Sequence, residues 1–362
     1  MAFSKKFHLQ QNIYALRTAF QLEKEKRQPT TGERLLMMRY SGFGGLKFVL
    51  NPVTNEIDIN HWRKNDHQFF EATQELHQLL RENSADEKEY RRYVDSMRNS
   101  VLTAFYTTPP LIKALADVMK ENGITVNKML EPSAGAGAFI ETFKERFGAI
   151  RDISAYEKDL LTGKILKHIY PDVNAHVRGF EDIPEADKES YDLVTSNIPF
   201  GTASVFDLSY TRGNDPAKAL AAKAIHNYFF LKGSDMLRDG GILAFITSQG
   251  VLDSPANQPI REALMKENNL VSVIRLPNNL FTDHAGTEVG SDLVILQKNK
   301  NKQELTENEK DFCQSIDAKD DRKINAWVMY SACTVFDEIV ESTDQYGRKQ
   351  PIYLHSGGSQ GI

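Results

Sequence analysis

The chain of 362 residues has two cysteines and no long apolar stretch. Cys313 and Cys333 show no metal-ligand spacing, so the sequence predicts no metal site and fits a protein of the reducing cytoplasm. No apolar run approaches the roughly 18 residues that span a bilayer, and we expect no membrane helix. The first twenty residues lack the apolar segment and cleavage site of a signal peptide, which predicts that they stay in the mature protein.

The chain also lacks an excess of positive charge. Its net charge is −5 and its isoelectric point is near 6.0, which argues against a broadly basic surface but leaves room for a local nucleic-acid groove. Residues 1–100 hold 16 lysines and arginines against 13 acidic residues. Arg91, Arg92 and Arg98 belong to this excess, although for each of them a solvated helix face is favoured over a phosphate contact.

Three parts follow one another along the chain. Residues 1–100 show helical spacing, for example at Ile13, Leu16 and Phe20, and predict a helical domain as one place for a DNA contact. The glycine-rich stretch YSGFGGLKF interrupts this domain and indicates a tight connection. Residues 301–362 begin with a strongly polar stretch, which predicts a linker and tail and indicates either a chain cut from something longer or one with a loose tail.

Residues 101–300 alternate short apolar strands with helices. The predicted strands are Lys128–Glu131, Ile153–Glu157, Asn174–Arg178, Asp192–Ser196, Ile242–Thr247, Leu270–Leu276 and Asp292–Gln297. The predicted helices are Pro109–Glu121, Ala138–Arg146, Leu160–Ile169 and Pro216–Leu237. This alternation predicts a mostly parallel sheet with helices on both faces, and such sheets bind ligands beyond the carboxyl ends of their strands.

The first motif at such a strand end is LEPSAGAGAF, residues 130–139. A strand ends at Glu131, and a turn through Gly135 and Gly137 leads into a helix whose free N–H groups can face a ligand. Dinucleotide sites usually carry a third glycine where this chain has Ile140, which favours a different cofactor. A turn that serves packing alone is the alternative.

Two acidic residues follow the next strands. Glu157 ends a strand 20 residues after Gly137, the usual distance for a carboxylate that accepts ribose hydroxyls. In VRGFEDIP, Glu181, or less favourably Asp182, can accept a hydrogen bond from an adenine amino group beside Phe180. These carboxylates suit a ligand with a ribose and no diphosphate, whereas ordinary surface turns are the alternative.

The stretch SNIPFG, residues 196–201, follows a further strand. Asn197 offers a side-chain carbonyl, Ile198 a backbone carbonyl and Phe200 a flat aromatic face. Two acceptors beside a stacking surface suit the amino group of a planar heterocycle or of a carboxamide. A turn with Phe200 packed inward remains open.

The order of EPSAGAG, Glu157, GFED and SNIPFG resembles the S-adenosylmethionine-dependent N6-adenine DNA methyltransferases, whose catalytic motif is (D/N)PP(Y/F). FYTTPPLI before the first strand is similar to their methionine-carboxylate motif at Thr108, and RLPNNLF…GTEVGSDLVILQK to their final strands. With the cofactor motifs first, this is the γ arrangement. Residues 10–300 resemble the methylase segment of large phage and plasmid methylase–helicase proteins, which implies a helicase domain or subunit as a partner.

The resemblance implies a Rossmann-like seven-stranded methyltransferase sheet whose last strand is antiparallel. It also implies a cofactor, S-adenosyl-L-methionine, and a double-stranded DNA substrate with a flipped adenine. The cofactor residues that it implies are Thr108, Glu131, Pro132, Gly135, Gly137, Glu157 and Glu181. The catalytic residues that it implies are Asn197, Ile198, Pro199 and Phe200, which clamp and stack the adenine. Ile198 replaces the usual proline, which keeps the carbonyl but predicts a less rigid site.

Two other functions stay open. Protein glutamine N5-methyltransferases are similar to this family and present a carboxamide to the same motif. A non-catalytic DNA-binding module could retain the fold. The target sequence is not visible, and specificity could rest on residues 1–100, on the loop Thr202–Asp215 or on a part outside this chain.

Overall fold

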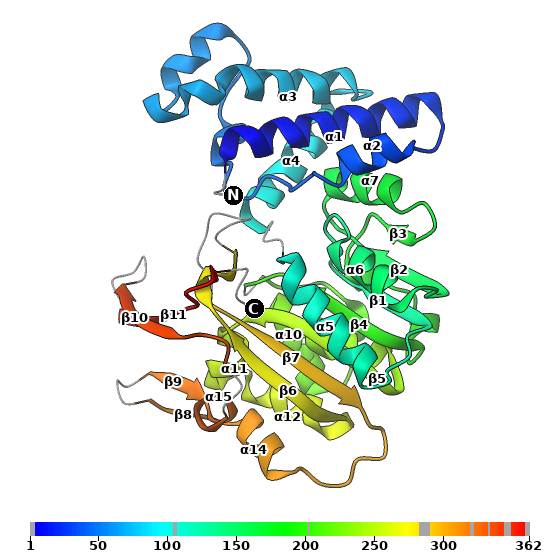
Figure 1. Cartoon of the computed structure of the whole chain (residues 1–362), viewed down its shortest axis with the longest axis vertical. Helices are drawn as coiled ribbons and strands as arrows, with labels where there is room; N and C mark the ends of the chain where they lie inside the picture. Colours follow the sequence, from blue (N-terminus) through cyan, green and yellow to red (C-terminus); the bar gives the residue numbers. More distant parts are fainter. Residues whose placement is uncertain are drawn as a thin grey trace.

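A computed structural model describes residues 4–103, 107–201, 203–281, 290–318, 322–331, 334–343 and 349–358. Parts of two predicted motifs, residues 104–106 and 282–289, lie outside the described residues, as does Cys333. The fold consists of one large sheet, a layer of N-terminal helices at one end of it and two small C-terminal hairpins (Figure 1). No helix among the described residues has the length and apolar character needed to cross a membrane.

The sheet has seven strands in the order β3-β2-β1-β4-β5-β7-β6. The strands are β1 Lys128–Glu131, β2 Asp152–Tyr156, β3 Asn174–His176, β4 Tyr191–Asn197, β5 Leu237–Ser248, β6 Asn268–Leu276 and β7 Ser291–Lys298. β1 to β5 pair in parallel, and β7 runs antiparallel between β5 and β6. All seven predicted strands are present, and the predicted Rossmann-like sheet with an antiparallel last strand is confirmed.

Apart from the short edge strand β3, the strands contribute residues to two cores, one on each face of the sheet. On β1, Met129 belongs to one core and Leu130 to the other, because successive side chains of a strand point to opposite faces. The first core is shared by α5 Pro109–Glu121, α6 Ala138–Phe147 and α7 Leu160–Ile169 with the N-terminal helices. The second core is shared by α10 Ile225–Met236, α12 Gln258–Glu267 and α14 Glu307–Cys313. The sheet is therefore covered on both faces, as predicted.

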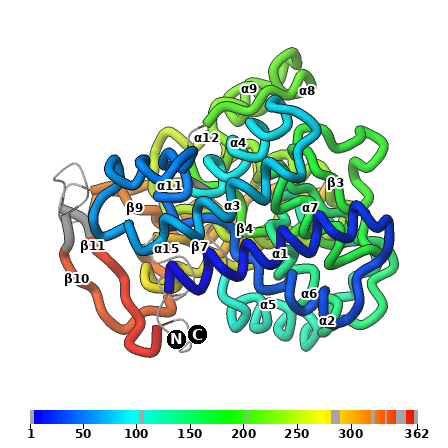
Figure 2. The backbone as a smooth tube through the Cα atoms, turned by 90° about the horizontal axis from the view of Figure 1, so that it is seen from above, coloured from blue at the N-terminus to red at the C-terminus, as the bar shows by residue number. Residues whose placement is uncertain are grey.

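The N-terminal helices form a layer beside α7 (Figures 1 and 2). They are α1 Lys5–Glu25, α2 Thr31–Met37, α3 Phe70–Glu82 and α4 Glu87–Thr103. In the stretch YSGFGGLKF, Gly42 and Gly45 adopt positive φ angles, which a side chain would strain. The backbone N–H of Phe43 donates to Ser100 Oγ at 2.9 Å, so this connection is fastened to the end of α4.

The predicted helix Pro216–Leu237 is interrupted in the structure. It divides into α9 Pro216–Ala221 and α10, with Ala224 in an extended conformation between them. No glycine or proline marks this break in the sequence. The Ala222 carbonyl instead accepts a hydrogen bond from Val205 N–H at 2.8 Å, a contact with a distant part of the chain. The strand β5 begins at once after α10.

Residues 301–362 differ from the predicted linker and tail. The structure forms α14, α15 Ala326–Tyr330 and two hairpins here, β8 Ser315–Asp317 with β9 Lys323–Asn325 and β10 Glu338–Thr343 with β11 Lys349–Leu354. Phe312 and Cys313 are buried in the second core. The guanidinium of Arg261 on α12 donates to the Cys313 carbonyl at 3.1 Å, which fastens the segment to α12. The polar composition of this segment gave no indication of the few contacts that fasten it to the rest of the fold.

Candidate active site

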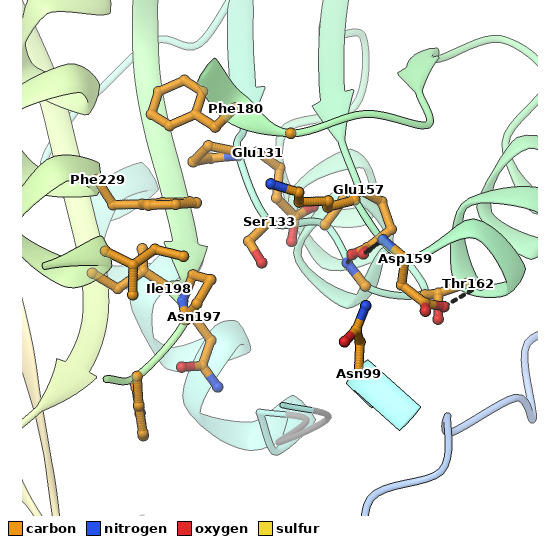
Figure 3. A pocket seen from close by; sticks show the side chains of 18 of the residues that line it. Asn99, Glu131, Ser133, Glu157, Asp159, Thr162, Phe180, Asn197, Ile198 and Phe229 are labelled. Carbon is orange, nitrogen blue, oxygen red and sulfur yellow. Dashed lines mark hydrogen bonds between the residues drawn. The ribbon is translucent and has the colours of Figure 1, made fainter. Parts of the chain in front are cut away.

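A cavity of about 570 Å³ lies at the carboxyl ends of β1, β2 and β4. Residues from all four sequence motifs line it, namely Glu131, Pro132, Gly135, Glu157, Glu181, Asn197, Ile198, Pro199 and Phe200. Figure 3 shows Glu157 and Asp159 on one side, Asn197 and Ile198 on the other, and Ser133 between them. The fold thus brings together side chains that are up to about seventy residues apart in the chain.

Glu131 is the last residue of β1 and lines the cavity just before the glycine turn. Its side chain is 1% exposed, and its Oε2 has no hydrogen-bond partner among the described residues. Complete burial raises the pKa of Glu131 well above its usual range, and the charge of Glu157 adds to the rise. A buried carboxyl group with an unused oxygen beside a cavity is suited to a polar or cationic ligand.

Gly137 does not line the cavity, although Gly135 does. Gly137 begins α6 with φ of 89°, and a Cβ at this position would lie 2.3 Å from the Tyr170 ring. The Tyr170 hydroxyl donates to the Gly137 carbonyl at 3.1 Å. The structure therefore gives Gly137 a packing role against Tyr170, whereas Gly135 is the glycine that faces the cavity.

Gly137→Ala is expected to lower the free energy of unfolding by about 2–4 kcal/mol, because left-handed strain and a steric clash add together. Gly123→Ala is the matched control just after α5, since Gly123 also has a positive φ of 72° but has no atom within 4 Å of a built Cβ. It should cost only about 1–2 kcal/mol. Denaturant unfolding measures both, and equal losses would contradict the role of Tyr170.

Glu157 closes the turn that contains Gly135. Its Oε2 accepts the Gly135 N–H at 2.8 Å, and its Oε1 accepts the Asp159 N–H at 2.7 Å. Burial, with a further contribution from the charge of Asp159, raises the pKa of Glu157 to about 7. Each carboxylate oxygen has a second lone pair, so Glu157 can still accept hydrogen bonds from the hydroxyl groups of a ligand.

Glu181, in the VRGFEDIP motif after β3, lines the cavity. Its neighbour Asp182 is exposed and does not line the cavity. The Lys158 ammonium lies 2.6 Å from Glu181 Oε1. Phe180 is buried and packs on the rings of Tyr228 and Phe229. The preference for Glu181 over Asp182 thus agrees with where the structure places the two side chains.

The stretch SNIPFG begins with the last two residues of β4, Ser196 and Asn197, and its Ile198 is 1% exposed. The Ile198 N–H donates to the Ile246 carbonyl of β5 at 3.0 Å, a bond that a proline could not form. This hydrogen bond restrains the backbone at Ile198, as the fixed φ of the usual proline would. It therefore offsets the loss of rigidity that the sequence predicted. Phe200 is half-buried: it packs on the first core and also lines the cavity.

Thr108 is completely buried and does not line the cavity, whereas its neighbour Thr107 does. Both hydroxyl groups are buried and have no hydrogen-bond partner in the part of the chain that the structure describes. The structure places this segment beside the cavity through Thr107 and not through the predicted Thr108. The structure makes Thr107 the better candidate for contact with a ligand.

Several lining residues were missed by sequence reasoning. Asn99 and Ser100 come from the end of α4, and Phe229 comes from α10 (Figure 3). The YSGFGGLKF stretch carried an indirect signal, because its Phe43 is bonded to Ser100. Ser96 also reaches this region, since its hydroxyl donates to the Asp159 carboxylate. The N-terminal helices therefore complete the cavity wall.

The sheet order and the cavity at its carboxyl edge define the class of Rossmann-like methyltransferase folds. A family model described as N-6 DNA Methylase matches residues 93–326. The chain belongs to the N-6 DNA methylase family.

The chain is similar at low sequence identity to one phage protein and to two solved structures of restriction-modification enzymes. The "Defense against restriction protein B" of Escherichia phage P1 is 27% identical over 201 residues, which cover 54% of this chain and 8% of that protein. This chain is thus a small fraction of that relative's length. The type I restriction-modification methyltransferase subunit from Streptococcus thermophilus is 15% identical with a TM-score of 0.47, covering 88% of this chain and 84% of that one. The type IIG restriction endonuclease BpuSI is 18% identical with a TM-score of 0.45, covering 81% and 37%.

Proposed function

We propose that this protein transfers a methyl group from S-adenosylmethionine to N6 of an adenine flipped out of double-stranded DNA. S-adenosylmethionine is the cofactor of the family to which the chain belongs. The observation that carries the proposal is that Asn197, Ile198 and Phe200 share one cavity with Gly135 and Glu157. A cofactor site and an amine-binding motif therefore open into the same space.

The charge of the cavity supports this cofactor. Burial raises the pKa values of Glu131, Glu157 and Asp159, and a cationic group bound beside these carboxyl groups would favour their charged forms. Among the described lining residues, Lys158 is the one with a cationic side chain, and it pairs with Glu181. S-adenosylmethionine carries a sulfonium and an ammonium group. It would supply such a cationic group, together with ribose hydroxyls for Glu157.

The chain's own residues would then prepare the adenine. The N6 lone pair is delocalised into the ring, so the amine is a poor nucleophile. Asn197 Oδ1 and the Ile198 carbonyl would accept its two hydrogens, direct the nitrogen at the methyl group and stabilise the positive charge that develops on it. Phe200 would stack on the extruded base. The Ile246 bond to Ile198 N–H holds the second acceptor in position.

Cofactor affinity is expected to rise by about tenfold between pH 6 and pH 8 and to level off above. The pKa of Glu157 is about 7, and ribose hydroxyls donate best to the charged carboxylate, so binding weakens as pH falls and Glu157 gains its proton. Calorimetry across this range measures the effect. Glu157→Gln should bind weakly with a flatter profile, and Glu181→Gln should retain the slope. A wild-type affinity that is constant from pH 6 to pH 8 would contradict this role.

The test of the function itself is incubation with labelled S-adenosylmethionine and, separately, unmethylated DNA, RNA and cell protein. We expect label in DNA as N6-methyladenine. Label in protein alone would support the glutamine methyltransferase alternative, in which a carboxamide occupies the place of the adenine. Absence of cofactor binding by calorimetry would support the non-catalytic DNA-binding module.

The partner of this protein and the boundaries of its domains are also part of this proposal. A helicase domain or subunit remains a prediction from the resemblance. The division into a helical part (1–100), a methyltransferase part (101–300) and a C-terminal part (301–362) also remains a prediction, as does a cytoplasmic location. α4 extends across residue 100, so the first two parts share one helix.

A further inference from the structure

The segment after SNIPFG places an aromatic side chain at the mouth of the cavity. Phe206 lines the cavity, yet 77% of its surface is exposed. Single exposed apolar side chains are common on proteins and carry no meaning alone. The position of Phe206 differs because the residues on both sides of it are buried and fastened.

The preceding residue is held by a backbone bond. Val205 is buried in the second core, and its N–H donates to the Ala222 carbonyl at 2.8 Å. This is the bond at which the predicted helix over residues 216–237 is interrupted. The helix is thus interrupted between α9 and α10 at the residue whose carbonyl binds Val205, immediately before Phe206.

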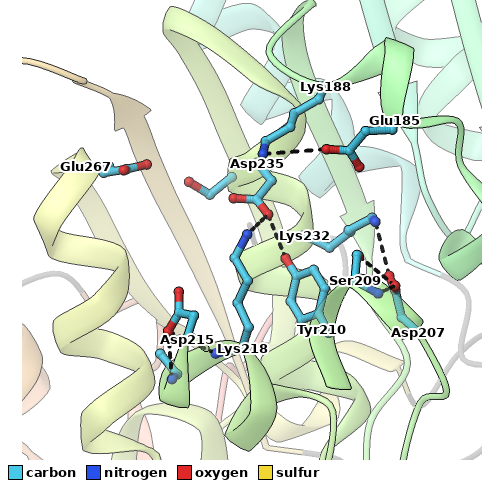
Figure 4. Close-up of polar contacts among 12 residues, drawn as sticks. Glu185, Lys188, Asp207, Ser209, Tyr210, Asp215, Lys218, Lys232, Asp235 and Glu267 are labelled. Atoms are coloured by element: carbon cyan, nitrogen blue, oxygen red, sulfur yellow. Dashed lines mark hydrogen bonds and ion pairs between the residues drawn. The ribbon is translucent and has the colours of Figure 1, made fainter. Parts of the chain in front are cut away.

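The following residue is held by a buried ion pair (Figure 4). Asp207 accepts hydrogen bonds from the Tyr228 hydroxyl at 2.7 Å and from the Lys232 ammonium at 3.1 Å, both on the buried helix α10. Although burial opposes it, bonds from Ser209, Tyr228 and Lys232 lower the pKa of Asp207 to about 2. The anchor is therefore charged at neutral pH.

A second pair of contacts stabilises the segment that continues from Asp207. The Tyr210 hydroxyl and the Lys218 ammonium both bond to Asp235 Oδ2, at 2.9 and 2.6 Å (Figure 4). Tyr210 lies on α8 Leu208–Thr211, and Figure 2 shows α8 and α9 at the edge of the molecule. With Val205 and Asp207 both fastened, the backbone on either side of Phe206 is fixed, so the ring is presented from a rigid part of the chain.

We propose that Phe206 enters the DNA duplex and fills the space that the flipped adenine leaves. The inference rests on the proposed function. Extrusion of a base leaves an unstacked gap, and apolar side chains are known to occupy such gaps between base steps. A rigidly presented phenyl ring beside the cavity that receives the base is suited to this task. Phe206 therefore stabilises the open duplex, while Phe200 contacts the extruded base.

The test compares duplexes in which flipping is costly or easy. The methylated site is first mapped by sequencing DNA treated with the wild-type protein. Oligonucleotide duplexes are then made with the target adenine paired to thymine or opposite an abasic site. Phe206→Ala should lower methylation of the paired duplex by about five- to hundredfold, the range of one lost stacking contact. It should be much closer to wild type on the abasic duplex.

Two variants serve as controls. Phe206→Trp should retain methylation of the paired duplex because it keeps an aromatic ring. Leu208→Ala should behave as wild type, because Leu208 is 47% exposed in the same segment but does not line the cavity. Cofactor affinity should be unchanged in all three variants.

Equal losses on both duplexes would overturn the proposal, because they would mean that Phe206 contacts the target base or shapes the cavity. An unchanged rate for Phe206→Ala would overturn it as well. Either result leaves the methyltransferase proposal intact, since that proposal fails only if the wild-type protein methylates no DNA.

Discussion

Replacing Asn197 with alanine is expected to lower the rate of methyl transfer by at least about 10²–10³-fold, the usual cost of one lost polar contact to a transition state. The side-chain carbonyl is one of the two acceptors proposed for the adenine amine, and alanine has no replacement for it. Asn197 ends β4 and is only partly buried, so the strand should still form. Single-turnover methylation with labelled cofactor measures the loss.

Asn197→Asp is the matched variant, because it keeps an acceptor oxygen at the same place. It should retain clearly more activity than the alanine variant. Cofactor affinity and the thermal unfolding midpoint should stay near the wild-type values in both. Wild-type rates in Asn197→Ala would remove the central residue from the proposed mechanism.

Replacing Phe200 with alanine is expected to lower kcat/KM for DNA by about five- to hundredfold, since stacking on an extruded base contributes about 1–3 kcal/mol. Phe200 lines the cavity next to Pro199, so its loss should affect paired and abasic substrates alike. This uniform effect separates Phe200 from Phe206. Steady-state methylation of the two duplexes provides the measurement.

Phe200→Tyr should restore most of the activity, because tyrosine offers the same flat face and is the other residue found in the family motif. Phe200 also packs on the first core, so Phe200→Ala should unfold cooperatively at a somewhat lower temperature. Full activity in both Phe200→Ala and Asn197→Ala would contradict the assignment of SNIPFG as the catalytic motif.

Local chemistry explains which elements could be predicted from the sequence. α5 and α7 begin and end where predicted. α5 has prolines at its first positions, and the Asp159 side chain caps α7 by accepting the Thr162 N–H at 2.8 Å. The apolar runs of β1 and β4 were equally clear. Each of these signals lies within a few residues of the element that it defines.

Other elements depend on contacts across the fold, which no local pattern carries. The break before α10 follows from the bond between Val205 and Ala222, residues that belong to different segments. The C-terminal hairpins have a polar sequence, and they are fastened by contacts such as that of Arg261 with Cys313. A short stretch of chain gives no indication of a partner fifty residues away.

At the site, the sequence by itself determined which chemical groups are available, namely the carboxyl groups, the glycine turn and SNIPFG, in an order that resembles that of N6-adenine methyltransferases. Only the tertiary structure decided which members of each motif face the cavity. It turned Gly135 and Thr107 inward, and it placed Gly137 against Tyr170. The physical reason is that residue type fixes what a group can bind, whereas direction and burial depend on neighbours that are distant in the chain. The position of Phe206 also depends on distant neighbours, because the buried contacts of Val205 and Asp207 hold the backbone on both sides of it at the cavity.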